Sequence, residues 1–517
     1  MQPSLLAQYK HKIKTPQELR EIIGPFPREK KVIMCHGVFD VVHPGHMRHL
    51  HYAKSKADVL VVSVTADRHI TKGIYRPHIP QELRAANLAA YELVDYVVID
   101  VNPKPIENIA AIQPDYFAKG FEYVAKGMPP KTAEEAEVLE AYGGEIIFTP
   151  GYMFFSSTEF IEMAPPELQH EKLLTLMDRE GLTFERMRET IHGMGKHKVH
   201  VVGDTIVDTL TYTTLIGAQA KTPTMSVLYE EHKDYVGGAG IVAMHLKAAG
   251  AEVAFSTVLG DDDMKDFVLG TLTEAQVDCR AIIDSTRPTT RKNAIVASGY
   301  RLLKLDTVDN RGVSDKVVRD LSEAVANVAC DAVVFSDFRH GMFNRRSIPT
   351  LTAAIPNGRV RVADSQVASR WGNITDFKGF DLITPNEREA RFALGDQDTG
   401  IRPLADQLYD AAQCKALILK MGDRGVLACR SRDHLALDSF CVVDSFVDRL
   451  IDPVGAGDAL LAYATLSLLT DKNVALAAIL GSLAAACECE RDGNIPILPD
   501  HVIRKIDSIE KKCKFQQ

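Results

Sequence analysis

The string I-D-P-V-G-A-G-D-A-L-L at residues 451–461 decides the fold of most of this chain. Gly455, Ala456 and Gly457 stand directly before an acid, Asp458, and an apolar helical pattern begins at once. Glycine gives the backbone access to conformations closed to other residues and leaves N–H groups free to point at an anion. The positive N-terminal end of the following helix adds to that attraction. We therefore predict a phosphate-binding turn in which Asp458 takes a proton from an adjacent alcohol.

The longer string is more informative than its glycines, because G-A-G-D by itself is also a common turn before a helix. The whole string resembles the D-x-x-G-A-G-D signature of the ribokinase-like (PfkB) carbohydrate kinases. The resemblance implies that Asp458 is the general base and that the glycine-rich turn is the anion hole. It also implies a three-layer α/β/α domain with a small lid sheet over residues 198–517.

Length and composition indicate a globular protein of several domains. The chain has 517 residues, and a prior of roughly 150 residues per domain predicts two to four domains. Hydrophobic residues make up 46% and charged residues 25%, which suits a soluble protein with sizeable cores. The net charge of −9 offers no chain-wide attraction to nucleic acid or to anionic lipid, so phosphate binding has to be local.

The sequence also predicts a cytoplasmic protein. The nine cysteines show no CxxC pair and no metal-ligand spacing, which is typical of thiols in a reducing compartment. Residues 1–14 lack the apolar core of a signal peptide. The most apolar stretch, 459–487, is broken by polar residues 470–473 and falls short of the roughly 20 residues that span a bilayer.

A second candidate phosphate site lies near the start of the chain. Residues 31–36 predict a buried strand that leads directly into G-V-F-D-V-V-H-P-G-H at residues 37–46. Further strands are predicted at 58–64 and 96–99, with a helix between them from about residue 81. This alternation predicts a parallel, Rossmann-like sheet with helices on both faces. Ligands of such sheets bind at the carboxyl ends of the strands, where residues 37–46 fall.

His43 and His46 are three residues apart, so they share one face at the mouth of the predicted helix. With a glycine between them and a helix dipole behind, they can donate hydrogen bonds to a phosphate that is gaining negative charge. A metal site that adds His36, His49 and His51 is an alternative, although no carboxylate pattern accompanies these histidines.

The motif G-x-F-D-x-x-H-x-G-H resembles the signature of the cytidylyltransferase-like nucleotidyltransferases, and further matches extend the resemblance over residues 1–162. It implies that His43, His46 and Lys54 stabilise the α-phosphate of a nucleotide as pyrophosphate leaves. Because R-T-x-G is missing before residue 156, the heptose-type branch is favoured, and the choice between CTP and ATP stays open. The positions that the resemblance assigns to nucleotide binding are Gly37, Phe39, Asp40, Lys119, Ser156, Ser157 and Thr158.

Two helix starts can be located from local chemistry. Thr15 and Glu18 form the pattern of a capping box with Pro16 at the first helical position, which predicts a helix to about residue 23. Residues 163–197 are polar and mixed in charge, and we predict a linker there that packs on the second domain, with Thr183 as a helix N-cap.

The second domain carries candidate substrate-binding residues near its start. Asp204 and Asp208 follow a predicted strand at 199–202, where the PfkB kinases have an acid that binds sugar hydroxyls. Two acids four residues apart are also compatible with an ordinary surface. Gly237 and Gly238 resemble the family's Gly-Gly motif, which lets a lid segment hinge and close.

Three later positions depart from the heptose kinases that the chain otherwise resembles. Asp337 lies in a segment like S-D-Y-x-K-G and is assigned to the substrate, but His340 replaces the lysine of that motif. Gln366 replaces the lysine of I-D-P-K, and Ile241 replaces a polar asparagine. Two missing ammonium groups weaken the expected grip on a distal sugar phosphate.

The remaining motifs concern the nucleotide of the kinase. Asn386 and Glu389 match the family's N-x-x-E, which organises Mg²⁺ through water. The motif is too short to be informative alone, but it falls between a predicted strand and helix upstream of the G-A-G turn. Lys420, Gly422 and Gly425 resemble the strand and turn that lie against the nucleotide.

Together the resemblances imply a bifunctional sugar-activating enzyme with Mg²⁺, in the domain order opposite to the bifunctional heptose enzymes. The kinase uses ATP to phosphorylate a sugar or a heptose-7-phosphate-like sugar phosphate at the anomeric hydroxyl. The transferase joins NMP from ATP or CTP to a sugar 1-phosphate. Alternatively, an active transferase acts on another sugar or polyol phosphate, and the second domain only binds sugar or dimerises; Ile241, His340 and Gln366 motivate that alternative. We also expect a homodimer that pairs through the lid sheet.

Overall fold

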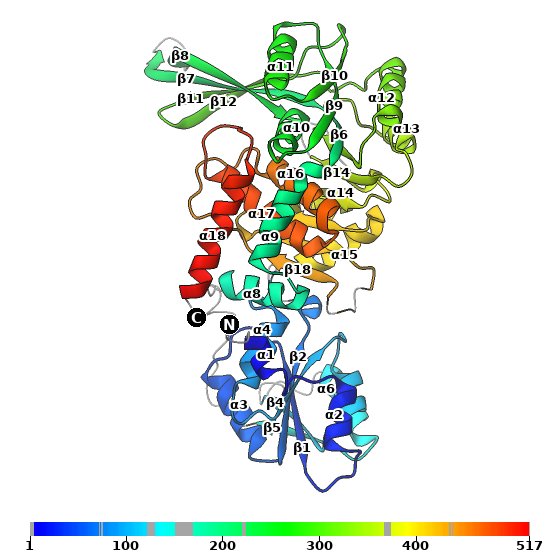
Figure 1. Cartoon of the computed structure of the whole chain (residues 1–517). Coiled ribbons are helices and arrows are strands. Elements are labelled where there is room, and N and C mark those ends of the chain that lie inside the picture. The colour runs from blue at the N-terminus through cyan, green and yellow to red at the C-terminus, as the bar shows by residue number, and fades with distance from the viewer. Residues whose placement is uncertain are drawn as a thin grey trace.

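The computed structural model describes residues 5–71, 73, 76–120, 130–149, 169–219, 224–366, 374–433, 436 and 438–515. These residues form two α/β bodies joined end to end, with a four-stranded sheet projecting from the far end of the second body (Figure 1). Both bodies are built on largely parallel sheets, which confirms the predicted fold class.

The first body is a five-stranded parallel sheet in the spatial order β3-β2-β1-β4-β5. Its strands are β1 (Val32–Gly37), β2 (Val59–Thr65), β3 (Tyr96–Asp100), β4 (Tyr116–Gly120) and β5 (Glu145–Thr149). Its helices are α1 (Leu5–Tyr9), α2 (Pro16–Ile23), α3 (Pro44–Lys54), α4 (Gln81–Ala89), α5 (Ile106–Ile112) and α6 (Pro130–Glu140), with the short turn η1 (Asp67–His69).

Strand β1 lies at the centre of this sheet and is buried on both faces. Ile33 and Cys35 belong to one core cluster and Val32 and Met34 to the other, as the alternation of side chains along a strand requires. The chain runs outward from β1 to β2 and β3, and returns to the other side of β1 as β4. The loop after β1 therefore lies at a topological switch point, where ligands of such sheets bind.

The joint consists of α8 (Gln169–Glu180), α9 (Phe184–Gly193) and η3 (Met194–Lys196). The side chain of Thr183 accepts a hydrogen bond from the backbone N–H of Arg186 at 3.1 Å, which confirms it as the N-cap of α9. Leu176 and Ile191 are buried in the same core cluster as the strands of the second body. The joint thus packs on the second body, and α8 lies next to the first (Figure 1).

The second body is a nine-stranded sheet in the order β10-β9-β6-β13-β14-β15-β16-β17-β18, parallel from β10 to β16 and antiparallel beyond. Its strands are β6 (Lys198–Gly203), β9 (Glu252–Leu259), β10 (Asp278–Ile283), β13 (Ala332–Asp337), β14 (Val360–Ser365), β15 (Leu382–Ile383), β16 (Leu417–Lys420), β17 (Val426–Cys429) and β18 (Phe440–Val443). The projecting lid sheet, in the order β12-β11-β7-β8, consists of β7 (Thr205–Gln219), β8 (Thr224–Gly238), β11 (Arg291–Ala297) and β12 (Tyr300–Thr307).

Helices cover both faces of the nine-stranded sheet. They are α10 (Ala239–Ala248), α11 (Asp263–Glu274), α12 (Asp315–Asn327), α13 (Ser347–Ala354), α14 (Glu387–Leu394), α15 (Ile401–Ala412), α16 (Ala456–Asp471), α17 (Val474–Cys489) and α18 (Pro499–Phe515), with short turns η4 (Ile374–Asp376) and η5 (Gly422–Arg424).

Helix α16, which follows the G-A-G turn, is buried on all sides. Every residue from 458 to 467 is buried, because α16 lies between the core and its equally apolar neighbour α17. The long apolar run in the sequence is thus the centre of a core. In the part of the chain that the structure describes, no helix combines the length and apolar character needed to cross a membrane.

Candidate active sites

A cavity of about 860 Å³ opens at the carboxyl ends of the parallel strands in the second body, bordered by the lid. Segments that lie far apart in the sequence meet around it, including β7, β8, the ends of β14 and β16, and the start of α16. The predicted residues that line it are Asp208, Gly238, Asn386, Glu389, Lys420, Gly422, Gly425, Gly455, Ala456, Gly457 and Asp458.

The G-A-G turn forms one wall of this cavity. Gly455 has φ +84°, a left-handed conformation that favours glycine, and it is the N-cap residue of α16. A Cβ atom on Gly455 would lie 2.4 Å from Oδ1 of Asn494, so no larger residue fits. The first turn of α16 therefore presents its dipole to the cavity at the place predicted for phosphate.

Asp458 lies in the first turn of α16 and is 8% exposed. Burial raises the pKa of its carboxyl well above the usual range, the neighbouring Asp364 raises it further, and Lys420 opposes the shift. The ammonium of Lys420 lies 3.0 Å and 3.2 Å from the two carboxylate oxygens of Asp364. A carboxylate with a raised pKa is a stronger base, as abstraction of a proton from an alcohol requires.

Asp208 faces the same cavity from strand β7. A Cβ atom on Gly237, in the adjacent strand β8, would lie 2.0 Å from Oδ2 of Asp208. Gly237 therefore has to be glycine for the carboxylate to occupy its position, in addition to any role in a hinge. Burial raises the pKa of Asp208, while Lys292 and Lys304 act in the opposite direction.

The N-x-x-E motif forms a capping box that faces the cavity. Asn386 caps α14 by accepting the backbone N–H of Glu389 at 2.8 Å, and Glu389 accepts the backbone N–H of Asn386 at 2.7 Å. Mg²⁺ prefers oxygen ligands and keeps several waters. The oxygen atoms of Asn386 and Glu389 already accept hydrogen bonds in the cap. These side chains therefore suit an ion that is held through water and not by direct coordination. Among the described residues, no three His, Cys, Asp or Glu side chains are arranged to hold a metal directly.

In the first body, His43 and His46 lie together at the start of α3, after β1. Their rings stack with centroids 3.9 Å apart. Nδ1 of His43 accepts the N–H of Gly45 at 3.1 Å, and Nδ1 of His46 accepts the N–H of His43 at 3.4 Å. Burial lowers the pKa of both rings, and for His46 the neighbouring His43 contributes to a value of about 4. Two neutral rings with Nδ1 occupied carry their protons on Nε2, from which they can donate to an anion; for His46 the backbone carbonyl of Val41 is a competing acceptor.

The loop between β1 and these histidines is held by its own side chains. Asp40 is 1% exposed and accepts hydrogen bonds from the N–H groups of His78 and Ile79, both at 3.0 Å. Phe39 has φ +52°, and its ring centroid lies 5.1 Å from that of His46. A Cβ atom on Gly37 would come within 3.1 Å of the Phe39 ring. These three predicted residues therefore shape the loop that presents the histidines.

Comparison with protein families matches each body to one family. The model described as pfkB family carbohydrate kinase matches residues 196–501, more than half of the chain, and the cytidylyltransferase-like model matches residues 34–163. The chain belongs to the pfkB family of carbohydrate kinases. The cytidylyltransferase-like match covers the residues around His43 and His46, so the first body resembles a second family.

Known proteins resemble this pfkB chain in part. Bifunctional protein HldE of Bradyrhizobium diazoefficiens is 26% identical over 334 residues, which are 63% of this chain and 65% of that protein. Bifunctional protein HldE of Acidiphilium cryptum is 28% identical over 329 residues, 60% of this chain and 64% of that protein. The chain thus spans less than two thirds of either relative. Phosphofructokinase-2 from Escherichia coli, in complex with potassium, shares the fold with a TM-score of 0.51 at 16% identity, covering 61% of this chain and 99% of that one.

Two acids that the pfkB resemblance assigned to the substrate have other partners. Asp204 and Asp337 are 4% and 1% exposed and are absent from the cavity lining. Asp204 accepts the N–H groups of Phe338 at 3.0 Å and His340 at 3.2 Å. Asp337 forms an ion pair with Arg339 at 2.7 Å. Both carboxylates hold the loop after β13, so this placement contradicts the prediction that they contact the sugar.

The structure also corrects the role of Lys54. It ends helix α3, eight residues after His46, which corresponds to about 12 Å along a helix. Its ammonium lies 2.6 Å from the carboxylate of Asp95 and donates to the carbonyl of Asp58. Lys54 therefore joins α3 to the opposite end of the sheet and does not reach a phosphate beside the histidines.

The other predicted nucleotide contacts of the first body are placed only in part. Lys119 lies near the end of β4, next to β1, and forms an ion pair with Glu135 and a 3.0 Å hydrogen bond to Thr132 of α6. It is thus at the correct edge of the sheet. Ser156, Ser157 and Thr158 lie outside the described residues.

Sequence patterns missed two lysines of the lid. Lys292 of β11 and Lys304 of β12 line the cavity and lie close enough to Asp208 to affect its pKa. Burial lowers the pKa of Lys292, and Asp208 opposes that shift. His340, by contrast, forms a 3.0 Å hydrogen bond with Asn310. Two ammonium groups therefore border the cavity from the lid, at positions that become evident only when the lid sheet is placed beside the body.

Proposed function

We propose that this chain is a bifunctional sugar-activating transferase. Its C-terminal domain phosphorylates a sugar, or a heptose-7-phosphate-like sugar phosphate, at the anomeric hydroxyl with ATP. Its N-terminal domain transfers NMP from ATP or CTP to a sugar 1-phosphate and releases pyrophosphate. The observation that carries the proposal is the single cavity shared by Asp458, the G-A-G turn, Asp208 and the Asn386–Glu389 cap.

The kinase reaction follows from the positions of these groups. Asp208 accepts hydrogen bonds from sugar hydroxyls and orients the acceptor. Asp458 takes the proton of the attacking hydroxyl, and the first turn of α16 stabilises the charge that develops on the transferred phosphoryl group. Asn386 and Glu389 would hold Mg²⁺ through water, and the ion would neutralise the charge of the triphosphate. Most of the catalysis is therefore positioning and electrostatics.

The lid lysines favour a substrate with a second negative charge. Lys292 and Lys304 enter the cavity from β11 and β12, on the side where Asp208 binds the sugar. The ammonium of Lys292 is partly buried, and a desolvated ammonium pairs strongly with a phosphate, whereas Lys304 is exposed. A sugar phosphate therefore suits this cavity better than a neutral sugar.

Nucleotidyl transfer needs no base, because a sugar phosphate is already an anionic nucleophile. His43 and His46, neutral and stacked, each offer one Nε2–H to the α-phosphate at the N-terminus of α3. Such donors, fixed before the reaction, stabilise the negative charge of the transition state.

A substrate panel tests the proposal. Purified protein is offered ATP with neutral sugars, sugar phosphates and polyol phosphates, and ADP is measured; pyrophosphate is measured with CTP or ATP and each sugar 1-phosphate. We expect ADP release with a sugar phosphate and pyrophosphate release with one nucleotide. If sugars raise the melting temperature but none is phosphorylated, the second domain is a sugar-binding module, and the kinase proposal is wrong.

The lid sheet is also the proposed dimer contact. It exposes a set of large apolar side chains, which a soluble monomer rarely gathers in one place. Sedimentation velocity should give a dimer for the wild type and a monomer for Leu303→Glu; a monomeric wild type would refute the pairing. The exposed large apolar residues of the lid are Leu215, Ile216, Met225, Leu228, Tyr229, Tyr300, Leu302, Leu303 and Leu305.

A further inference from the structure

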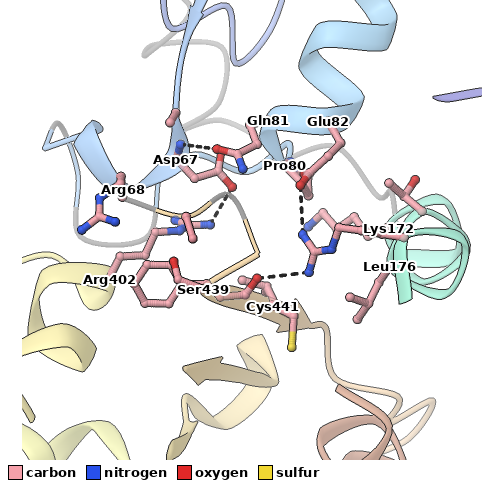
Figure 2. Close-up of a pocket in the computed structure, with 16 residues that line it drawn as sticks. Asp67, Arg68, Pro80, Gln81, Glu82, Lys172, Leu176, Arg402, Ser439 and Cys441 are labelled. Carbon is pink, nitrogen blue, oxygen red and sulfur yellow. Dashed lines mark hydrogen bonds and ion pairs between the residues drawn. The ribbon is translucent and has the colours of Figure 1, made fainter. Parts of the chain in front are cut away.

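A residue of the kinase domain reaches into the transferase domain at the junction between them. A small cavity of about 60 Å³ lies there, lined from both sides. Figure 2 shows Arg402 of α15 pointing across this junction toward Asp67, with a dashed line between them. Nη2 of Arg402 lies 3.2 Å from Oδ2 of Asp67, and Nη1 donates to the carbonyl of Arg76, also at 3.2 Å. The Arg402 side chain is only 10% exposed, so both bonds are sheltered from water.

The bond between Arg402 and Asp67 leads to Val38, near the start of the loop that precedes the histidines. The second carboxylate oxygen of Asp67 accepts from Nη2 of Arg84 at 2.7 Å. Arg84 is fully buried, and its guanidinium also donates to the carbonyls of Val38, Thr65 and Ile79. Asp67 is thus the link between Arg402 and the residue that fixes the backbone of Val38.

The bond between Arg402 and the carbonyl of Arg76 leads to Asp40, further along the same loop. Nε of Arg76, whose carbonyl Arg402 binds, donates to Oδ2 of Asp40 at 3.1 Å. Val38 and Asp40 flank Phe39, whose ring lies against that of His46. The guanidinium of Arg402 is therefore linked to both neighbours of Phe39. One link runs through Asp67 and Arg84 to Val38. The other runs through Arg76 to Asp40.

We propose that Arg402 is a positioning residue of the nucleotidyltransferase site, so that the kinase domain completes the transferase. The inference rests on the proposed transferase function. The planar fork of arginine suits two acceptors at fixed positions, here Asp67 and the Arg76 carbonyl, better than a point charge does. Without the Arg402 guanidinium, the partly buried carboxylate of Asp67 keeps only its ion pair with Arg84. The carbonyl of Arg76 also loses its hydrogen bond to Arg402, so the segment that carries Arg76 is held less firmly.

The test compares two variants of the full-length chain. Arg402→Gln removes the fork. Asp406→Asn is the matched control: it lies one turn later on α15 and removes the 3.4 Å ion pair with Arg68 across the same junction. Hydrogen exchange of His78 and Ile79, whose amides bind Asp40, should be faster in Arg402→Gln and unchanged in Asp406→Asn. Equal exchange in the two variants would refute the proposal.

Activity provides the second measurement. Pyrophosphate release by Arg402→Gln should fall about three- to thirty-fold, the range found for residues that act through others. ADP release should be unchanged, and Arg402→Lys should lie between the wild type and Arg402→Gln. If the wild type releases pyrophosphate and Arg402→Gln releases it equally well, the positioning role is wrong. If the wild type releases none while the exchange difference holds, the transferase function fails and the link between Arg402 and the loop stands.

Discussion

The two candidate sites handle charge in opposite ways. Around the kinase cavity, carboxylates and an ammonium are buried together, and the pKa of Asp458 is raised. At the start of α3, two histidines stack as neutral rings because burial lowers the pKa of both. An alcohol needs a base to become a nucleophile, whereas a phosphate does not. Each site therefore has the kind of group that its proposed reaction requires: a carboxyl of raised basicity for an alcohol, and uncharged hydrogen-bond donors for a phosphate.

The strongest test of this contrast is removal of the base. Asp458→Asn keeps the size of the side chain but cannot accept the proton, so ADP release should fall about 10²- to 10⁴-fold. Pyrophosphate release should stay at the wild-type rate, because the transferase uses no base. Both rates are measured on one preparation. A kinase rate within a few-fold of wild type would show that another group takes the proton.

The corresponding change in the first body is His46→Ala. Removal of one donor to a developing negative charge costs about 10²- to 10³-fold in rate. We expect that loss in pyrophosphate release, with ADP release unaffected. His49→Ala is a suitable control, since His49 lies on the same helix and its Nδ1 contacts the hydroxyl of Thr149 at 2.9 Å. Equal losses in both variants would indicate damage to α3 in place of a role in catalysis.

Local chemistry allowed the sequence to predict much of the fold and the core of each site. The Thr15 capping box and the Thr183 cap are interactions between near neighbours, and both form as predicted. The turn at Gly455 and the pairing of His43 with His46 likewise depend on residues a few positions apart. Such features can be read from spacing because one helix turn determines their geometry.

Features that depend on how distant segments meet could not be predicted. Asp204 and Asp208 look alike in sequence, but the loop after β13 covers only Asp204. Lys292 reaches the cavity because the lid sheet borders it, and Arg402 matters only because two domains touch. Lys54 lies eight residues after His46, so the length of α3 places it at the far end of the helix, away from the histidines.

The lid lysines allow a test of whether the kinase cavity binds a second negative charge on the sugar. Replacing Lys292 or Lys304 by alanine should raise KM for a sugar phosphate about tenfold, since a hydrogen bond to a charged group is lost. KM for ATP should change little. Lys233→Ala serves as the control, because that lysine belongs to the lid strand β8 but pairs with Glu231 at 3.3 Å on its exposed surface. An equal rise in KM for a neutral sugar would show that the lysines shape the lid without binding a second charge.

The smallest effect concerns pH and separates the sites most directly. Asp458 acts only when ionised, and its pKa is raised well above the usual range of an aspartate, so ADP release should begin to fall at a pH where an ordinary aspartate is still ionised. His46 stays neutral down to its pKa of about 4, so pyrophosphate release should be flat over the same range. Asp364→Asn removes a like charge beside Asp458 and frees Lys420 to oppose the shift, so the acidic limb of the kinase profile should move to lower pH. If the limb stays in place in Asp364→Asn, burial alone sets the pKa of Asp458. A parallel fall in both activities would instead mean that the protein unfolds, because protonation of the buried histidines favours the unfolded chain below about pH 6.5.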